Sequence, residues 1–471
     1  MSDAPAPSTA NNKQDDSSRA PSGGALDDYR KRGGALFRAS EIDARLLGLV
    51  LALAASWIIF DIASAVIGQG GSSIFGGNFL IPRNLWNLSV QTVSIAVMAT
   101  GMVLIIVSRN IDLSVGSLLG FLAMIMGLVQ TEILPEFLGF GHPFIWILTL
   151  VVGLSLGAII GAGQGFLVAY LGIPAFIVTL GGLFIWRGAA FALAQGVTVA
   201  PLDTTFKLIG GGTEGSLGRL GVDLGIGSET LSWLLGIGVV LLLIGVVLYS
   251  RRRRRAYGFP TRPTWAEIAI IGGGSVLVLG SVWVANSYAW PTRVAQRYAE
   301  AIGLAIPEGG LIFANGIAYP VLIMLGVAAA MTFLTRRRRF GRYVYAIGGN
   351  PDAAELSGIN VKRTIMLTFV LMGVLVAVAA AITSGRLDAA VNSLGQLNEL
   401  YVIAAAVVGG TVLSGGIGTI PGAILGALFI QTLQSGMVLI GMDTQTQNIV
   451  IGVVLVAAVG LDVQLRKRSE T

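Results

Sequence analysis

The sequence has no cysteine and a single histidine, and only 12% of its 471 residues are charged. Without cysteine, disulfides and thiolate metal sites are excluded, and one histidine cannot form a metal cluster or a histidine triad by itself. A soluble domain carries roughly 25% charged residues, so the composition also excludes a soluble globular fold. We therefore expect a membrane protein that has no catalytic residues and no metal site.

Nothing in the sequence supplies energy for work across a membrane. No Gly-x-x-x-x-Gly-Lys-Ser/Thr motif occurs, so the chain cannot hold nucleotide phosphates in a P-loop. Carboxylates such as Asp112 and Glu399 fall at the edges of apolar runs, and none lies in the middle of a predicted span. Ion-coupled carriers usually need buried acidic groups. The chain therefore resembles a conduit driven by another subunit, and an ion-coupled carrier acting alone is the alternative.

The sequence does contain long apolar runs, with 54% hydrophobic residues and a mean hydropathy of +0.78. Because a helix needs about 20 apolar residues to cross a bilayer, we predict an all-α polytopic transmembrane helical bundle of about 10 to 12 spans. Two of the twelve segments come from splitting long runs, which leaves re-entrant segments open as the alternative. The segments lie near 45–67, 84–108, 113–131, 143–170, 173–195, 230–250, 264–287, 310–335, 364–385, 399–414, 418–440 and 444–462.

Arginine and lysine occur in runs that could indicate a nucleic-acid partner, and the net charge is +6. Each run adjoins an apolar segment, however, which is the pattern that the positive-inside rule gives for cytoplasmic helix ends. We therefore expect no nucleic-acid partner. With twelve spans, both termini and all basic clusters lie in the cytoplasm. The clusters are Arg251–Arg255, Arg336–Arg342, Lys362–Arg363 and Arg466–Arg468, which hold 15 of the 31 basic residues.

The chain divides into one membrane domain and two tails. Residues 1–43 are polar and contain no apolar run, so we expect a disordered cytoplasmic tail. Residues 44–465 form the transmembrane domain, which includes a cytoplasmic loop at 336–363, and residues 466–471 form a short cytoplasmic tail. The glycine-rich segment 196–229 is expected to be an irregular cap at the outer surface, or a short re-entrant piece.

Glycine recurs every fourth residue in one predicted span and again in a later one. Glycines on one helix face allow a neighbouring backbone to approach closely, so we predict tight helix packing there. The similar strings Gly-Ala-Ile-Ile-Gly-Ala and Gly-Ala-Ile-Leu-Gly-Ala also indicate an internal duplication, which we leave open. The glycines are Gly153, Gly157, Gly161 and Gly165 in the first span, and Gly422 and Gly426 in the second.

Polar side chains inside the spans have two interpretations each. Asn87, Gln91 and Ser94 share one face of a helix, and a polar face toward lipid is costly. They therefore line a translocation path or form interhelical hydrogen bonds, and the sequence favours neither. Arg187 lies within a span, where an arginine is a candidate functional residue. We favour a structural role for Arg187, with its guanidinium reaching toward the outer end of the helix.

The loop at 336–363 is polar, basic and rich in glycine, and it lies between two long apolar segments. Such a loop is suited to present a docking surface to a cytoplasmic partner. Phe340-Gly341-Arg342 and Asn350-Pro351 are both predicted to break helices. Asp112 and Ser114, in a second turn, suit the start of a helix, where side-chain oxygens accept hydrogen bonds from free backbone N–H groups.

Four blocks of this sequence resemble the ribose/galactoside/xylose-type permeases of bacterial ABC importers. The resemblance spans roughly residues 45–465, and it is closest to the D-xylose permeases, which also carry a long middle insertion with an arginine-rich patch, here Arg251–Arg255. The first block is the family signature, formed by Ile111, Asp112, Leu113, Ser114, Val115 and Gly116. The other blocks lie at 174–188, 341–361 and 403–416.

The resemblance implies the ABC importer permease fold and import of a monosaccharide across the bacterial inner membrane. D-xylose is the expected sugar, and ribose or another small polyol is the alternative. The expected partners are a cytoplasmic ABC ATPase, a periplasmic sugar-binding protein, a second permease copy and membrane lipid. This chain is expected to bind no cofactor, because the ATPase uses the ATP and Mg. The resemblance places an ATPase-coupling loop at Gly348, Gly349, Asn350, Ala353, Ala354, Ser357, Gly358 and Ile359.

Overall fold

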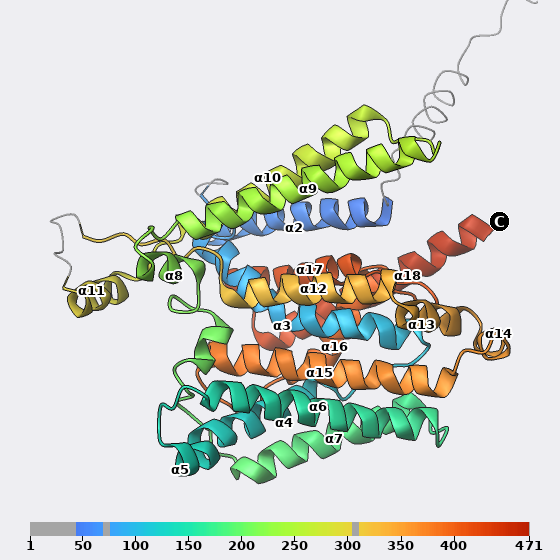
Figure 1. The fold of residues 1–471 in the computed structure, drawn as a ribbon, viewed down its shortest axis with the longest axis horizontal. Helices are drawn as coiled ribbons and strands as arrows, with labels where there is room; N and C mark the ends of the chain where they lie inside the picture. Colours follow the sequence, from blue (N-terminus) through green and yellow to red (C-terminus); the bar gives the residue numbers. More distant parts are fainter. Residues whose placement is uncertain (1–43, 69–75, 304–309, 471) are drawn as a thin grey trace, which may run out of the picture.

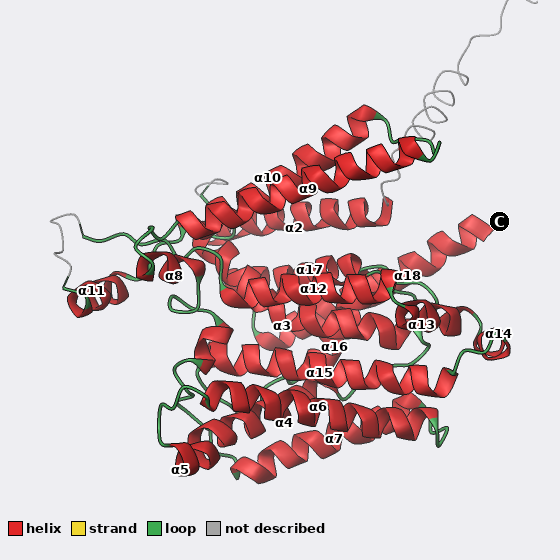
Figure 2. Ribbon diagram, viewed as in Figure 1, coloured by secondary structure: helices red, strands yellow, loops and turns green. Residues whose placement is uncertain are grey.

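The computed structural model describes residues 44–68, 76–303 and 310–470, so the predicted tail at 1–43 lies outside the described residues. Its described part is helical, and isolated bridges are the only β-pairs within it (Figure 2). Ten of the described helices are long and apolar enough to cross a membrane, which confirms the predicted all-α polytopic bundle. The domain boundaries at 44 and 465 stay a prediction.

The long helices account for most of the chain (Figure 1). Of the predicted spans, 113–131 is longer than expected, because α4 continues through a π-helical turn and α5 to Leu138. The long helices are α2 (Ala44–Gly68), α3 (Pro82–Val107), α4 (Val115–Leu128), α6 (Ile145–Ala169), α7 (Ala175–Ala194), α9 (Thr230–Ala256), α10 (Thr264–Ser287), α12 (Tyr319–Arg337), α15 (Val361–Leu387), α17 (Ile420–Leu439) and α18 (Thr444–Glu470).

Shorter helices occupy most of the predicted loops. The segment 196–229 is irregular, as predicted, and carries one 3₁₀ turn and one short helix. The short elements are η1 (Val129–Ile133), α5 (Leu134–Leu138), η2 (Phe206–Gly210), α8 (Leu217–Asp223), α11 (Thr292–Ala301), α13 (Arg339–Gly349), α14 (Pro351–Leu356) and α16 (Asn398–Val408).

Two predicted spans are wrong in their bounds. The span at 310–335 begins only at Tyr319, because a loop bridged to other segments precedes it. The span at 399–414 contains only the 11-residue helix α16, which is about 16 Å long and too short for an apolar layer of about 30 Å. Leu397 in the left-handed region precedes α16, and a turn at Gly409-Gly410 ends it. Sequence hydropathy cannot detect these breaks, because the flanking residues are also apolar.

Helix α3 forms the centre of the bundle (Figure 1). Its residues from Ile95 to Val107 are buried, and α12, α15, α16 and α17 pack around it. A helix that is apolar on all sides is stable in lipid as well as among other helices. The apolar composition of α3 is therefore compatible with its central position but does not set it, since the equally apolar α9 lies at the periphery.

The glycine faces pack closely against neighbouring backbones, which confirms the predicted tight packing. A Cβ atom at Gly161 would collide with the carbonyl oxygen of Phe369 in α15, and one at Gly157 would collide with that of Gly373. In α17, Gly426 has the same close contact with Ala405 of α16. The two glycine strings thus serve the same packing purpose, while the internal duplication stays a prediction.

The long helices lie roughly along one common axis, some running one way and some the other, so the bundle has two ends (Figure 1). At one end lie α13, α14, the α9–α10 connection and the C-terminal end of α18; we refer to it as the α13 end. Helices α5, α8 and α11 lie at the other end, the α8 end. The basic runs at Arg251–Arg255 and Arg336–Arg342 therefore gather at the same end, as the even number of spans between them predicts.

The packing of α6 against α15 predicts the effect of a larger side chain at Gly161. We expect Gly161→Leu to lower the free energy of unfolding by about 1–3 kcal/mol, because overpacking forces the helices apart. Gly163 is the matched control, since it lies in the same helix and a Cβ there would have nothing within 4 Å. Tryptophan-fluorescence melting in detergent measures both variants. Equal melting temperatures for the Leu variants at 161 and 163 would contradict the packing argument.

Candidate functional site

The loop that joins α16 to α17, residues 409–419, meets the ends of α3 and α13. The N–H of Gly416 donates to the carbonyl of Val107 at 3.0 Å. Arg109 donates from Nε to the carbonyl of Gly348 and from an Nη to that of Gly349, both at 2.8 Å. A Cβ atom at Gly348 would collide with Val107 and Gly416, so only glycine fits there. These contacts join three segments that are distant in sequence into one junction.

Helix α13 is amphipathic and buries one face against this junction. Its buried residues are Gly341, Val344, Ile347 and Gly348, which follow the spacing of a single helix face. Beside them, the hydroxyl of Tyr345 donates to the carbonyl of Gly418 at 2.6 Å. Burial raises the pKa of Tyr345, so its hydroxyl stays protonated and remains a donor at neutral pH.

Helix α14 is the exposed tip of the predicted coupling loop. The side-chain oxygen of Asn350 accepts a hydrogen bond from the N–H of Ala353 at 3.0 Å, which caps the helix. Gly358 has a φ of +80°, which a glycine adopts without strain as the chain turns toward α15. At the tip, the side chain of Leu356 is 90% exposed. Single exposed apolar side chains are common on protein surfaces, so Leu356 indicates an interface only together with the coupling role that the sequence predicts for this loop.

Of the predicted helix breaks in this loop, one is right and one is wrong. Asn350-Pro351 separates α13 from α14 as predicted. Phe340-Gly341-Arg342 lies inside α13, and the chain bends earlier, at Arg338, whose backbone is extended. Gly341 instead allows α13 to fold tightly back on α12, because a Cβ there would collide with Thr335. The predicted coupling residues thus fall on two helices and the turn after them, and their coupling role stays a prediction.

The signature segment at 111–116 is buried where α4, α6 and α7 meet. One carboxylate oxygen of Asp112 accepts from the N–H and the hydroxyl of Ser114, at 2.9 and 2.7 Å. Gln164 of α6 donates to the hydroxyl of Ser114 at 2.9 Å, and Thr179 of α7 donates to the carbonyl of Ile111 at 3.3 Å. Ser114 precedes α4, as predicted, but its side chain does not cap the first turn. The signature therefore organises three helices.

Before α16, the chain lies inside the bundle without forming a helix. Carbonyls of Leu394 and Gly395 contact α4 at Gly120 and Gly116, while Ala390 contacts it at Gly127. That part of α4 is about 16 Å long, and α16 adds about 16 Å more toward the α13 end. Together they match an apolar layer of about 30 Å. Residues 388–408 therefore form one crossing in two pieces, which we call the broken span.

Arg187 of α7 holds the non-helical part of the broken span. Its guanidinium donates to the carbonyls of Asn392 and Leu394 at 3.2 and 3.0 Å. Non-helical backbone is tolerated at membrane depth only where protein or a cavity satisfies its polar groups. Our sequence-based view that the side chain reaches toward the outer helix end is wrong, because its partners are carbonyls inside the bundle.

The sequence predicts no carboxylate in the middle of a predicted span, and Glu399 does lie in the first turn of α16, but the structure buries it. Glu399, at the start of α16, is only 7% exposed. Its Oε2 atom has no hydrogen-bond partner among the described residues, and the carboxylate interacts electrostatically with Arg187. The sequence places Glu399 at the edge of an apolar run, but the break before α16 carries that edge into the interior.

The polar face of α3 is engaged mostly by neighbouring helices. Gln91 accepts a hydrogen bond from Gln431 of α17 at 3.1 Å, and the hydroxyl of Ser94 lies 2.6 Å from that of Thr383 in α15. Asn87 makes no hydrogen bond within the described part of the chain. These contacts fit the interhelical interpretation for two of the three residues, and the translocation lining stays a prediction.

Comparison with known proteins identifies the family of this chain. A sequence profile described as the branched-chain amino acid transport system permease component matches residues 84–459. The xylose transport system permease protein of Haemophilus influenzae is 35% identical over 436 residues, which cover 92% of this chain and 100% of that protein. Its counterpart from Escherichia coli K12 is 35% identical over 83% of this chain and 88% of that protein.

A ribose import permease protein of Escherichia coli K12 is 31% identical over 83% of this chain and 88% of its own length. No solved structure matches the chain. The relatives are transport permeases rather than enzymes, which fits a bundle of long apolar helices. Since the profile covers more than half of its length, the chain belongs to the family described as the branched-chain amino acid transport system permease component.

Proposed function

We propose that this chain is the membrane permease of an ATP-driven importer that carries D-xylose into the cytoplasm. The observation that carries this proposal is the 35% identity to a xylose permease over its complete length. The arginine-rich α13 end is then cytoplasmic by the positive-inside rule. With the broken span counted as one crossing, both termini lie on that side of the bacterial inner membrane.

The partners of this proposal come from the permease family, and the exposed elements indicate where each would bind. Helix α14 presents Leu356 at the cytoplasmic end, where an ABC ATPase docks and uses ATP and Mg. A periplasmic sugar-binding protein delivers the sugar at the α8 end, and two permease copies form the complete gate. Gly348, Gly349, Asn350, Ala353, Ala354, Ser357, Gly358 and Ile359 form or support the docking element.

The junction beside α13 can transmit movement from the docked ATPase to the sugar translocation pathway. Movement of α14 and α13 acts on residues 409–419 through Tyr345 and Arg109, and this loop begins where α16 ends. A half-helix attached to an irregular segment can tilt without disrupting a continuous helix. Broken helices mark binding sites in many transporters. The broken span is therefore the element that ATPase closure moves between inward-open and outward-open states.

Two alternatives are tied to specific observations. The 31% identity to a ribose permease supports import of ribose or another small polyol by the same mechanism. The buried carboxylate of Glu399 supports an ion-coupled sugar carrier. The guanidinium of Arg187 interacts electrostatically with this carboxylate, which favours a structural role for Glu399 over ion coupling.

Uptake by reconstituted vesicles tests the proposal. We expect proteoliposomes that contain the permease and its ATPase, with the binding protein outside, to accumulate labelled D-xylose. Accumulation should require ATP on the ATPase side of the membrane, inside the vesicle. A protonophore should leave this uptake unchanged, and labelled ribose should enter more slowly. ATP-independent uptake that the protonophore abolishes would establish the ion-coupled alternative. Faster entry of ribose would still support an ATP-driven importer, but would identify ribose as its substrate.

Leu356 is expected to anchor the ATPase. We predict that Leu356→Ser weakens association with the ATPase at least about tenfold, since burying a leucine contributes about 1.5–3 kcal/mol. Ile312 provides the matched control, because it is 82% exposed and adjoins Phe313, whose carbonyl accepts a hydrogen bond from the N–H of Trp290 just before α11. Ile312→Ser should leave association unchanged. Binding of purified ATPase to the permease in detergent measures both, and equal affinities for the two variants would place docking elsewhere.

Arg187 is expected to position the broken span. Arg187→Ala leaves the carbonyls of Asn392 and Leu394 without their donor, at a cost of about 1–3 kcal/mol for each buried group. We predict that transport is lost while ATPase docking through α14 persists, and that Arg187→Lys restores part of the transport. Uptake and ATPase binding measured on the same preparations check this. Full transport by Arg187→Ala would exclude the positioning role.

A further inference from the structure

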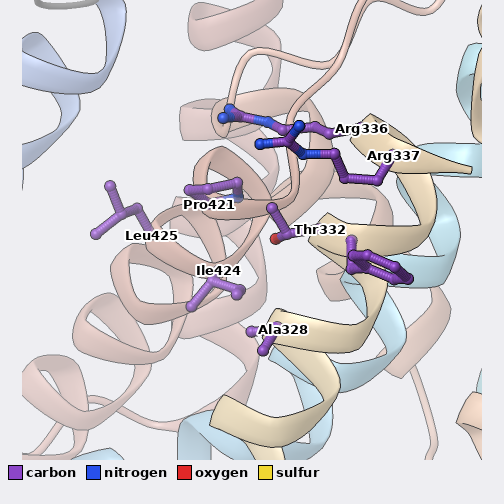
Figure 3. Close-up of a pocket in the computed structure, with 9 residues that line it drawn as sticks. Ala328, Thr332, Arg336, Arg337, Pro421, Ile424 and Leu425 are labelled. Atoms are coloured by element: carbon purple, nitrogen blue, oxygen red, sulfur yellow. The ribbon is translucent and has the colours of Figure 1, made fainter. Parts of the chain in front are cut away.

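A groove opens between α12 and α17 near the α13 end. It encloses about 770 Å³, and its walls are mostly apolar, with Ala328, Phe333, Ile424 and Leu425 among the lining residues. Arg336 and Arg337 also line it. Figure 3 shows both guanidinium groups extending over Pro421 at one end of the groove, while Ala328 lies at the other end. The groove thus has a cationic end and an apolar end.

The two arginines are uncompensated. Neither forms an ion pair with any described residue, and no aspartate or glutamate lines the groove. Elsewhere at the same end of the bundle, Arg251 is paired with Glu267 at 2.6 Å. Two adjacent guanidinium groups without a carboxylate provide the fork geometry that binds a phosphate oxygen strongly.

A second groove adjoins the first through Arg337. It encloses about 680 Å³ and is lined by the C-terminal part of helix α9 and the turn after it, including Val246, Tyr249 and Arg253. The α9–α10 pair packs against α8 and against the first turns of α3, where Trp86 and Val90 cluster with Ala285 of α10. Near the α13 end, the space between α9 and α12 is therefore open to a ligand from the lipid phase.

We propose that these grooves bind an anionic phospholipid of the cytoplasmic leaflet. Its phosphate lies on Arg336 and Arg337, and an acyl chain runs along the apolar lining between α12 and α17. Basic pockets between membrane helices on the cytoplasmic side recognise anionic headgroups in this way. This inference rests on the proposed orientation of the α13 end, but it does not depend on which sugar is carried.

The proposed lipid site adjoins the junction that residues 409–419 form with the ends of α3 and α13. Arg336 and Thr332 also line a small cavity of about 50 Å³ together with Tyr345 and Gly418, whose hydrogen bond joins α13 to residues 409–419. A bound phosphate would therefore fix Arg336 beside the contact that passes ATPase movement to the broken span. The lipid is thereby placed to stabilise the docked arrangement of α13.

Native mass spectrometry of the intact detergent-purified permease tests this site. Wild type mixed with equal amounts of phosphatidylglycerol and phosphatidylcholine should retain phosphatidylglycerol preferentially. The double variant R336Q/R337Q should reduce that retention about tenfold, because both charge-assisted hydrogen bonds are lost. The control R252Q/R255Q removes the same charge at the same end of the bundle, from residues that do not line either groove, and should retain the lipid.

A second variant leaves both arginines unchanged. It tests whether the lipid occupies the groove or is only attracted to the positive charge at the surface. Ala328→Trp fills the apolar end of the first groove, so phosphatidylglycerol retention should fall while the melting temperature stays close to that of wild type. Equal retention of the two lipids by wild type would overturn the proposal. So would equal loss in both arginine double variants, or unchanged retention in Ala328→Trp. Weaker binding of the ATPase or of a second permease copy to R336Q/R337Q, with lipid retention unchanged, would assign the groove to that protein instead.

Discussion

The structure depends on satisfying backbone carbonyls where a membrane crossing is not helical. In the broken span, Arg187 donates to two such carbonyls, and Leu394 and Gly395 pack closely against the glycine face of α4. Without these contacts, polar backbone would face hydrocarbon, which no membrane fold tolerates. This single constraint explains an arginine inside α7 and glycines at Gly116 and Gly120, and it brings Glu399 to the interior.

A second constraint joins the exposed helix α14, through α13, to the interior. Gly348 has no side chain because the backbones of Val107 and Gly416 occupy that space. Arg109 then holds the end of α13 by its carbonyls, so the segment before the signature and the predicted coupling loop form one unit. In the proposed mechanism, a movement of α14 reaches the loop before α17 through these close backbone contacts and through the side chains of Tyr345 and Arg109.

The parts that were predictable depend on local pattern. Apolar run length predicts ten of the helices, four-residue glycine spacing predicts the close approach of α6 to α15, and Asn350-Pro351 predicts the break before α14. The parts that were missed depend on partners far away in the chain. Arg109 precedes the signature and gave no signal of its own, because its acceptors lie beyond residue 340. Leu356 could have been found as the apolar residue in an otherwise polar loop.

By itself, the sequence determined that this protein is a helical membrane bundle whose basic clusters share one end, since hydropathy and charge act on each segment separately. Only the tertiary structure decided that residues 388–408 cross in two pieces, that Arg187 and Glu399 interact inside the bundle, and that α12 and α17 leave a cationic groove. These features arise between segments that are far apart in the chain. Their energies depend on which backbone and side-chain atoms meet, and no local pattern encodes that.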